Sequence, residues 1–259
     1  MNGFNEQLRL KNKIRNGDPC LGLFVKTPSM HTVELLASVG LDFVVLDAEH
    51  APFSIEALDS CILAGRAVGI NVLVRVDGMK THLIQSVLDM GAAGVIIPHI
   101  RSANEARQAV SATQYSKGSR GFSASHRAAC YGRLPAADHR ESSDESIIVL
   151  GQIEDADAVE NIDEIAAVVG LDALFIGSAD LSISLGVKHA DDPMVEQAID
   201  KICQSCVNAG KTIGLFLPST EAVPQFREKG IHLFFISSDQ SLLRKAATEL
   251  ADSFKKVTL

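Results

Sequence analysis

Three polar residues that could act on a substrate each stand at the end of a short apolar run of the sequence. Asp47 and His50 lie three positions apart after one run, and Arg75 ends another. A histidine beside a carboxylate is typical of a general base, because imidazole can accept a proton near neutral pH. The forked N–H donors of an arginine suit a carboxylate or an enolate oxygen. In the simpler alternative His50 is a surface residue. Arg75 then forms only a salt bridge to Asp47 or Glu49.

Two acidic residues follow two later apolar runs and are candidate metal ligands. Glu154 comes after Ile147–Gln152, and Asp180 comes after Ala173–Ile176. On neighbouring strands the two carboxylates can reach one cation, and hard ions such as Mg²⁺ and Mn²⁺ prefer oxygen ligands. The alternative is that Glu154 complements a helix dipole and Asp180 caps a helix.

A divalent cation, a base and an arginine together suit the chemistry of 2-oxo acids. The carboxylate and keto oxygens of such an acid chelate the cation, which then stabilises the enolate formed at C3. This chemistry supports carbon–carbon cleavage, condensation or decarboxylation. The Schiff-base alternative needs a lysine on the same rim. Lys26 is the only lysine close after an apolar run, since Lys211 precedes one.

The elements that must position these residues follow an alternating pattern. Eight short runs rich in Val, Ile, Leu and Phe read as buried strands, and amphipathic stretches between them read as helices. Ser54 and Ser102 stand where helix N-caps are expected. The predicted strands are Leu21–Val25, Phe43–Leu46, Val72–Val74, Gly94–Ile97, Ile147–Gln152, Ala173–Ile176, Thr212–Phe216 and Leu233–Ile236. The predicted helices are Asn5–Arg15, His31–Val39, Ile55–Ala67, His82–Asp89, Ala103–Ala112, Val159–Val168, Met194–Asn208, Glu221–Lys229 and Gln240–Phe254.

This pattern predicts an α/β protein with a (β/α)8 TIM barrel and an additional N-terminal helix, in one domain of residues 1–259. The 259 residues give roughly 32 per strand–helix unit, and about 250 residues is the size of such a barrel. An open doubly wound sheet is the alternative, but no G-x-G-x-x-G follows the first strand. Active sites of barrels lie at the carboxyl ends of the strands, where the polar residues above are found. The long connection from Tyr115 to Ser146 is predicted to be functional or partly ordered as a lid.

Composition excludes several functional classes. Twenty-four Lys and Arg against 32 Asp and Glu give a net charge of −8, which disfavours binding to nucleic acid or an anionic membrane. No apolar stretch approaches the roughly 20 residues of a membrane span. The five scattered cysteines make a disulfide framework unlikely, and Cys203-x-x-Cys206 falls inside a predicted helix without a second pair. The absence of a secretory signal after Met1 adds to the expectation of a cytoplasmic protein.

Several motifs, taken together and in order, resemble the HpcH/HpaI family of class II, metal-dependent pyruvate aldolases. The loop Arg120–Ala128 is similar to the branch that contains 2-dehydro-3-deoxyglucarate aldolase, and the chain is also similar to 4-hydroxy-2-oxoheptanedioate aldolase. The matching stretches are Phe43–Pro52 (FVVLDAEHAP), Val74–Val76, Leu88–Ala92, Gly118–Gly121, Gly151–Glu154 (GQIE) and Phe175–Ser182 (FIGSADLS).

The resemblance implies roles for particular residues and an assembly. It implies that Mg²⁺, Mn²⁺ or Co²⁺ is the cofactor and that the last helix swaps onto a neighbour in a homohexamer built as a trimer of dimers. Many relatives have proline where this chain has Ser178. The implied roles are metal binding by Glu154 and Asp180, a base at His50 supported by Asp47, Arg75 on the pyruvyl keto oxygen, Gln152 beside pyruvate, the backbone of Gly177, Ser178, Ala179 and Asp180 on its carboxylate, and Asp89 near a subunit interface.

The leading hypothesis is a reversible aldolase that splits a 4-hydroxy-2-oxo acid, such as a 2-dehydro-3-deoxy sugar acid, into pyruvate and a small aldehyde through a metal-stabilised enolate. A metal-dependent oxaloacetate decarboxylase is the alternative among enzymes, because loss of CO₂ gives the same enolate. A non-catalytic metabolite-binding barrel is the alternative of another class, although a pure binding protein has no need of a base. The sequence does not identify the aldehyde.

Overall fold

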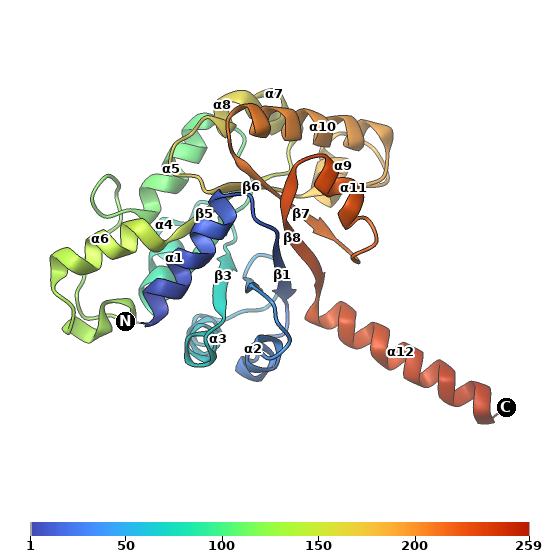
Figure 1. Cartoon of the computed structure of the whole chain (residues 1–259), viewed down its shortest axis with the longest axis horizontal. Helices are drawn as coiled ribbons and strands as arrows, with labels where there is room; N and C mark the ends of the chain where they lie inside the picture. Colours follow the sequence, from blue (N-terminus) through green and yellow to red (C-terminus); the bar gives the residue numbers. More distant parts are fainter. Residues whose placement is uncertain (1, 259) are drawn as a thin grey trace.

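The computed structural model describes residues 2–258, and its strands form a closed barrel (Figure 1). All eight strands run parallel, and the last pairs with the first. The strands are β1 (Cys20–Val25), β2 (Phe43–Asp47), β3 (Asn71–Arg75), β4 (Gly94–Ile97), β5 (Ile148–Ile153), β6 (Ala173–Ile176), β7 (Thr212–Leu217) and β8 (Ile231–Ser238).

Helices connect successive strands and cover the outside of the barrel, which confirms the predicted (β/α)8 fold and its additional N-terminal helix. The helices are α1 (Asn2–Arg15), α2 (Met30–Ala37), α3 (Ile55–Val68), α4 (Thr81–Met90), α5 (Ala103–Thr113), η1 (Arg127–Gly132), α6 (Ala136–Ser146), α7 (Ala156–Glu160), α8 (Ile162–Ala166), α9 (Ser178–Ser184), α10 (Pro193–Asn208), α11 (Val223–Glu228) and α12 (Asp239–Thr258).

The interior of the barrel is filled by large apolar side chains from several strands. The rings of Phe175 and Phe235 lie 4.4 Å apart, and that of Phe24 lies 5.7 Å from Phe235. Phe43 packs edge-on against Phe235 at 5.3 Å. Gly22 makes room for this ring, because a Cβ at position 22 would fall 2.1 Å from it. The barrel is therefore packed solid below its carboxyl ends.

Helix α1 closes the amino end of the barrel. Ile14 of this helix is fully buried with the interior side chains. Thr212 at the start of β7 donates its hydroxyl hydrogen bond to the Ile14 carbonyl at 2.6 Å, and Lys11 donates to the Ile147 carbonyl at 2.5 Å. With one end closed, a ligand can reach the barrel only from the carboxyl end.

Three helical segments differ from the prediction. The expected helix Val159–Val168 is two short helices, α7 and α8, because the backbone at Asn161 leaves the helical region between them. Helix α9 was not predicted, since its seven residues include three serines and are too few to show a helical period. The connection after α5 contains η1 and α6, so it is ordered as a small structural unit.

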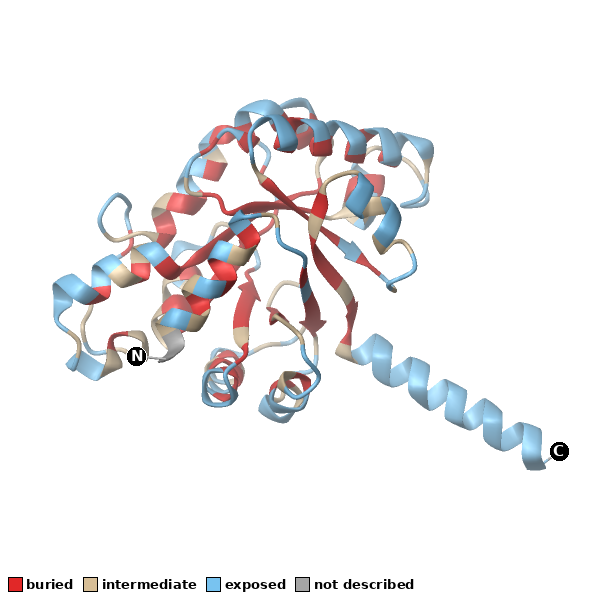
Figure 2. Cartoon of the chain, in the orientation of Figure 1, coloured by how far each residue is buried: buried red, intermediate tan, exposed pale blue. Residues whose placement is uncertain are grey.

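Helix α12 differs from every other long helix in that it extends away from the barrel (Figure 1). None of its residues is buried, and Figure 2 draws the helix as exposed beyond its first residue, Asp239. Four large apolar side chains of α12 are nevertheless 65–80% exposed, namely Leu243, Leu250, Phe254 and Val257. Within residues 2–258 no helix is both long enough and apolar enough to cross a bilayer.

Candidate active site

A cavity of about 270 Å³ opens at the carboxyl ends of the strands. Its wall includes residues that follow or end β1, β2, β3, β5, β6, β7 and β8, so almost the entire rim of the barrel contributes. The rings of three phenylalanines form its apolar side. The lining residues are Phe24, Lys26, His50, Arg75, Gln152, Phe175, Gly177, Ser178, Ala179, Asp180, Phe216, Ser238 and Ser241.

Asp47 and Arg75 form a two-point ion pair next to this cavity. Arg75 Nε donates to Asp47 Oδ1 at 3.0 Å, and Arg75 Nη2 donates to Oδ2 at 2.8 Å. Asp47 is fully buried and Arg75 is 7% exposed. Burial by itself would raise the pKa of Asp47, but the hydrogen bonds and charge of Arg75 outweigh it and hold that pKa below its ordinary value. The salt bridge foreseen as an alternative for Arg75 is therefore present, and Arg75 also lines the cavity.

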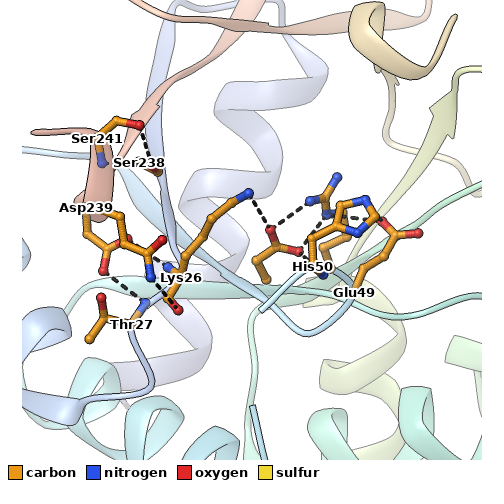
Figure 3. Close-up of polar contacts among 10 residues, drawn as sticks. Lys26, Thr27, Glu49, His50, Ser238, Asp239 and Ser241 are labelled. Carbon is orange, nitrogen blue, oxygen red and sulfur yellow. Dashed lines mark hydrogen bonds and ion pairs between the residues drawn. The ribbon is translucent and has the colours of Figure 1, made fainter. Parts of the chain in front are cut away.

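His50 stands at the mouth of the cavity, with about half of its side chain exposed. Its backbone N–H, rather than its ring, donates to Asp47 Oδ1 at 3.1 Å. The ring Nε2 lies 3.7 Å from Glu49 Oε2, which in turn lies 3.4 Å from Arg75 Nε (Figure 3). Burial raises the pKa of Glu49, and the charge of Arg75 opposes this shift. Asp47 therefore fixes the turn that carries His50, and Glu49 is the carboxylate beside the imidazole.

Glu154 lies behind the opposite wall, almost completely buried at 2% exposure. Its Oε1 accepts the backbone N–H of His99 at 2.9 Å, and its Oε2 accepts an N–H from Gln152. Burial raises the pKa of Glu154, and the nearby charge of Asp180 adds to that shift, although the two hydrogen bonds oppose it. Gly177 allows this approach, because a Cβ there would fall 2.9 Å from Glu154 Oε2.

The β5–β6 wall offers oxygen atoms that suit a hard divalent cation. The charge of the Asp180 carboxylate raises the pKa of Glu154, and the buried Oε1 of Gln152 accepts no hydrogen bond from a described residue. In residues 2–258 no group of three or more His, Cys, Asp or Glu side chains is arranged to hold a metal. The donor set therefore fits an ion such as Mg²⁺ or Mn²⁺, which uses few carboxylates and fills its shell with water and substrate oxygens.

Asp89 belongs to a different cluster, outside the cavity lining. Its Oδ1 lies 2.7 Å from Arg120 Nη2 and 3.4 Å from His126 Nε2. The Arg120 guanidinium stacks over the ring of Tyr115 at 4.3 Å. In the same cluster, burial and the neighbouring His126 lower the pKa of His139 to about 4. These contacts fasten the segment between α5 and β5 to α4, and none of the described residues of that segment lines the cavity, so the expected lid is not seen.

The predicted site residues fall into three groups. His50, Arg75, Gln152 and the stretch Gly177–Asp180 line one cavity. Asp47 and Glu154 lie directly behind its wall through the contacts above, and Asp89 lies elsewhere. Ser238 and Ser241, at the β8 end, also line the cavity but were not predicted as site residues, and Lys26 was expected there only as a Schiff-base lysine. Their position after the first and last strands of a closed barrel was the available signal.

The fold and the site together define a class of protein: a parallel (β/α)8 barrel with acidic residues, an arginine and a histidine at the carboxyl ends of its strands. A family model described as "HpcH/HpaI aldolase/citrate lyase" matches residues 21–246. The chain is 36% identical over 227 residues to 5-keto-4-deoxy-D-glucarate aldolase of Klebsiella pneumoniae, an alignment that covers 87% of this chain and 88% of that protein.

Two solved structures support the same placement. An HpcH/HpaI aldolase/citrate lyase family protein from Burkholderia cenocepacia J2315 superposes with a TM-score of 0.91 at 32% identity, over 95% of this chain and 99% of that one. Citrate synthase SbnG superposes with a TM-score of 0.87 at 32% identity, over 96% and 99%. This chain therefore belongs to the HpcH/HpaI aldolase/citrate lyase family, as its motifs predicted, and it is an enzyme of the carbon–carbon lyase class.

Proposed function

We propose that this protein is a divalent-metal-dependent aldolase that reversibly cleaves a 4-hydroxy-2-oxo acid of the deoxy sugar acid type into pyruvate and an aldehyde. The observation that carries the proposal is that Arg75, His50 and Asp180 line one cavity, with the Glu154 carboxylate close enough to Asp180 to be affected by its charge. The relatives named 5-keto-4-deoxy-D-glucarate aldolase support the substrate class.

Arg75 would stabilise the oxygen of the pyruvate enolate. Its Nε and Nη2 are held by Asp47, while Nη1 donates to no described residue and is available to a ligand in the cavity. Because Asp47 fixes the guanidinium at two points, its charge is oriented before substrate binds. The buried pair thus prepares a positive group for the carbon–carbon cleavage step.

The start of α9 would hold the pyruvate carboxylate. The first helical hydrogen bond there runs from Leu181 N–H to the Gly177 carbonyl, so the N–H groups of Ser178, Ala179 and Asp180 make no backbone bond within the described residues. All three residues line the cavity. Gln152 lies beside them and presents its unpaired Oε1.

His50 would act as the base. In cleavage it would take the proton of the 4-hydroxyl group, and in condensation it would take a proton from C3 of pyruvate. Its position at the mouth of the cavity suits a group that meets the aldehyde half of the substrate. Glu49 would orient the imidazole from 3.7 Å away.

Glu154 and Asp180 would hold the cation, with Mg²⁺, Mn²⁺ and Co²⁺ as the candidates. When bound, the cation would supply positive charge for the keto and carboxylate oxygens of the 2-oxo acid. Glu154 itself needs this charge, because burial and the nearby charge of Asp180 disfavour its ionised form.

Removal of the metal tests this function. Treatment with EDTA is expected to abolish cleavage of a 4-hydroxy-2-oxo acid, and Mn²⁺, Mg²⁺ or Co²⁺ is expected to restore it. Activity that survives chelation, together with trapping of Lys26 by borohydride and pyruvate, would instead establish Schiff-base chemistry. Decarboxylation of oxaloacetate passes through the same enolate as aldol cleavage, so the relative rates distinguish the two functions. Faster turnover of oxaloacetate than of any aldol substrate would favour the decarboxylase.

We also propose that α12 packs against a second copy of the chain, in a homo-oligomer such as the hexamer that the family resemblance implies. Leu243, Leu250, Phe254 and Val257 recur on one face of the helix, and an amphipathic face of this kind normally packs against another element. Beside the start of α12 the barrel leaves an apolar groove, which includes Leu21, Leu23, Leu41 and Ile236. These four residues form an apolar stripe on α12, and the groove is apolar as well, so the stripe of one chain suits the groove of a second copy.

The mass in solution tests the assembly. Phe254→Glu places a charge in the stripe and is expected to reduce the mass measured by light scattering to that of a smaller species. Lys256→Glu places a glutamate on another face of α12, outside the groove, and is expected to preserve the wild-type mass. A wild-type monomer would contradict the proposal.

The five cysteines are all free, which fits the proposed cytoplasmic location of such an enzyme.

A further inference from the structure

Lys26 is a cation in the cavity for which the proposed aldol chemistry has no role. It follows β1, and its backbone is fixed by the first residues of α12 (Figure 3). Asp239 Oδ1 accepts the Lys26 N–H at 2.8 Å, and Oδ2 accepts the Thr27 N–H at 3.0 Å. Gln240 donates to the Lys26 carbonyl at 3.4 Å. The side chain thus starts from an anchored backbone and reaches into the cavity.

The Lys26 ammonium group is not needed to neutralise its neighbour. Its Nζ lies 3.4 Å from Asp47 Oδ2. That carboxylate already accepts two N–H groups of Arg75 and the backbone N–H of His50. Among residues 4–258 Asp47 is the one carboxylate within 4 Å of Lys26 Nζ, and a third of the Lys26 side chain is exposed to the cavity. The ammonium therefore keeps N–H donors for a ligand.

A hydroxyl group lies in the same part of the cavity. Ser238 donates its hydroxyl hydrogen to Ser241 Oγ at 3.1 Å, and the Ser241 N–H donates to Ser238 Oγ at 3.2 Å. The hydroxyl hydrogen of Ser241 is not used in these bonds, so it can be donated to a ligand. Both serines line the cavity with Lys26, and Figure 3 shows the two serines beside the start of α12.

The order of the strands separates this corner from the pyruvate side. In a closed ring of eight strands, β1 and β8 are neighbours and lie across the barrel from β5. Gln152 lies in β5 and the Gly177–Asp180 stretch follows β6, whereas Lys26 follows β1 and Ser241 lies in the first turn of α12, after β8. A substrate that is held by its pyruvyl end at β5–β6 can extend its aldehyde half across the cavity toward Lys26.

We propose that Lys26, with the Ser241 hydroxyl, binds a carboxylate at the far end of the aldehyde half. Lys26 is then a specificity-determining residue, which selects an aldehyde fragment that is itself an anion over a neutral one. This inference rests on the proposed aldolase function and adds the charge of the aldehyde. Because a charge-assisted hydrogen bond favours an anion over a neutral analogue, the selectivity can be measured directly.

The test compares aldehydes of opposite character in condensation with pyruvate. Glyoxylate and succinate semialdehyde carry a carboxylate, whereas glycolaldehyde and propionaldehyde are neutral. Lys26→Met retains the length of the side chain and removes its charge. It is expected to lower kcat/KM for the two anionic aldehydes about 10- to 100-fold, mainly through KM, with changes under about twofold for the neutral ones. Lys26→Arg is expected to restore part of the loss, and Lys201→Met on the outer face of α10 is the matched control.

Exchange of the pyruvate methyl protons with deuterium separates the possible failures. The proposal requires wild-type exchange in Lys26→Met, because the pyruvate side is intact. Equal losses for anionic and neutral aldehydes, or lost exchange, would show that Lys26 acts through Asp47 and would overturn the proposal. A wild-type enzyme that neither exchanges nor condenses pyruvate would overturn the aldolase function and this inference with it. Normal wild-type activity without discrimination by Lys26→Met would reject the role of Lys26 alone.

Discussion

The two sides of the catalytic rim differ in how their charges are balanced. On the β2–β3 side Asp47 is held by Arg75 at two points and approached by Lys26. On the β5–β6 side Glu154 and Asp180 have no lysine or arginine within 4 Å among the described residues, and Glu154 meets only the neutral or protonated ring of His99. The pKa values of the two sides consequently shift in opposite directions. The hydrogen bonds and charge of Arg75 hold the pKa of Asp47 below its ordinary value against the effect of burial, whereas burial raises the pKa of Glu154.

This difference shows which side of the site is electrostatically balanced by residues of the chain and which side needs a bound cation. Asp47 is a buried acid that is paired with Arg75 at both oxygens, and it orients Arg75 without a bound metal or ligand. A buried acid beside a second carboxylate, with no cation nearby, is stabilised when a cation binds. The same barrel rim therefore combines a preassembled half with a half that requires a metal.

The largest expected effect is the loss of activity in Glu154→Gln. Removal of one proposed metal ligand from the β5–β6 side should reduce kcat/KM by about 10³-fold, because the charge that stabilises the enolate is lost. The metal-free variant should unfold at the wild-type temperature or above it, since a buried charge is replaced by an amide. Glu164→Gln, on the exposed side of α8, is the control for the general effect of the substitution.

Calorimetric titration with Mn²⁺ completes this experiment. Wild type should bind one ion per chain, and Glu154→Gln should bind it at least tenfold more weakly. Undiminished affinity in the variant would mean that the β5–β6 side is not the metal half, and the contrast between the two sides would lose its meaning.

The next largest effect is the destabilisation caused by Asp47→Asn. This substitution leaves the buried guanidinium of Arg75 without its two-point partner, which costs about 3 kcal/mol for a broken buried pair. The melting temperature should fall by about 6–12 °C in the presence or absence of metal. A melting temperature within 1 °C of wild type would show that Glu49 replaces Asp47 and that the preassembled half is not rigid.

The smallest expected effect is the pH dependence of the destabilisation that Asp47→Asn causes. The pKa of Asp47 is below its ordinary 3.8 in the folded protein, so the unfolded chain binds a proton first as the pH falls. The stability that the Asp47 carboxylate contributes is complete above pH 3.8 and is lost as the pH falls through the folded value. Urea unfolding should therefore give a constant difference between wild type and Asp47→Asn from pH 7 to pH 5. The difference should shrink below pH 4, and a difference that grows in acid would contradict the assigned pairing.

The fold could be predicted because local sequence and global topology agree. The runs Gly94–Ile97 and Ala173–Ile176 became strands with the predicted bounds, since residues buried on both faces leave a continuous apolar signal. Ser54 and Ser102 cap helices as expected, by accepting the N–H groups of Ala57 and Glu105. The site residues at strand ends followed from the rule that parallel strands bring their carboxyl ends together.

The remaining features depend on contacts that no local pattern encodes. The ring of His50 faces Glu49 because Asp47 is already occupied by Arg75, and this could not be read from the spacing of 47 and 50. Lys26 meets Asp239 only because β8 closes on β1, more than 200 residues away in the sequence. The direction of α12 likewise depends on where the chain leaves β8, and the described residues of one chain leave its apolar stripe uncovered.

A crystal of the protein soaked with Mn²⁺ and oxamate, a stable analogue of the pyruvate enolate, tests the central claim most directly. We expect an anomalous scattering peak within about 2.3 Å of a carboxylate oxygen of both Glu154 and Asp180, with oxamate oxygens completing the shell. A fully occupied manganese ion elsewhere, or oxamate bound at the rim with both carboxylates turned away and no ion between them, would contradict it.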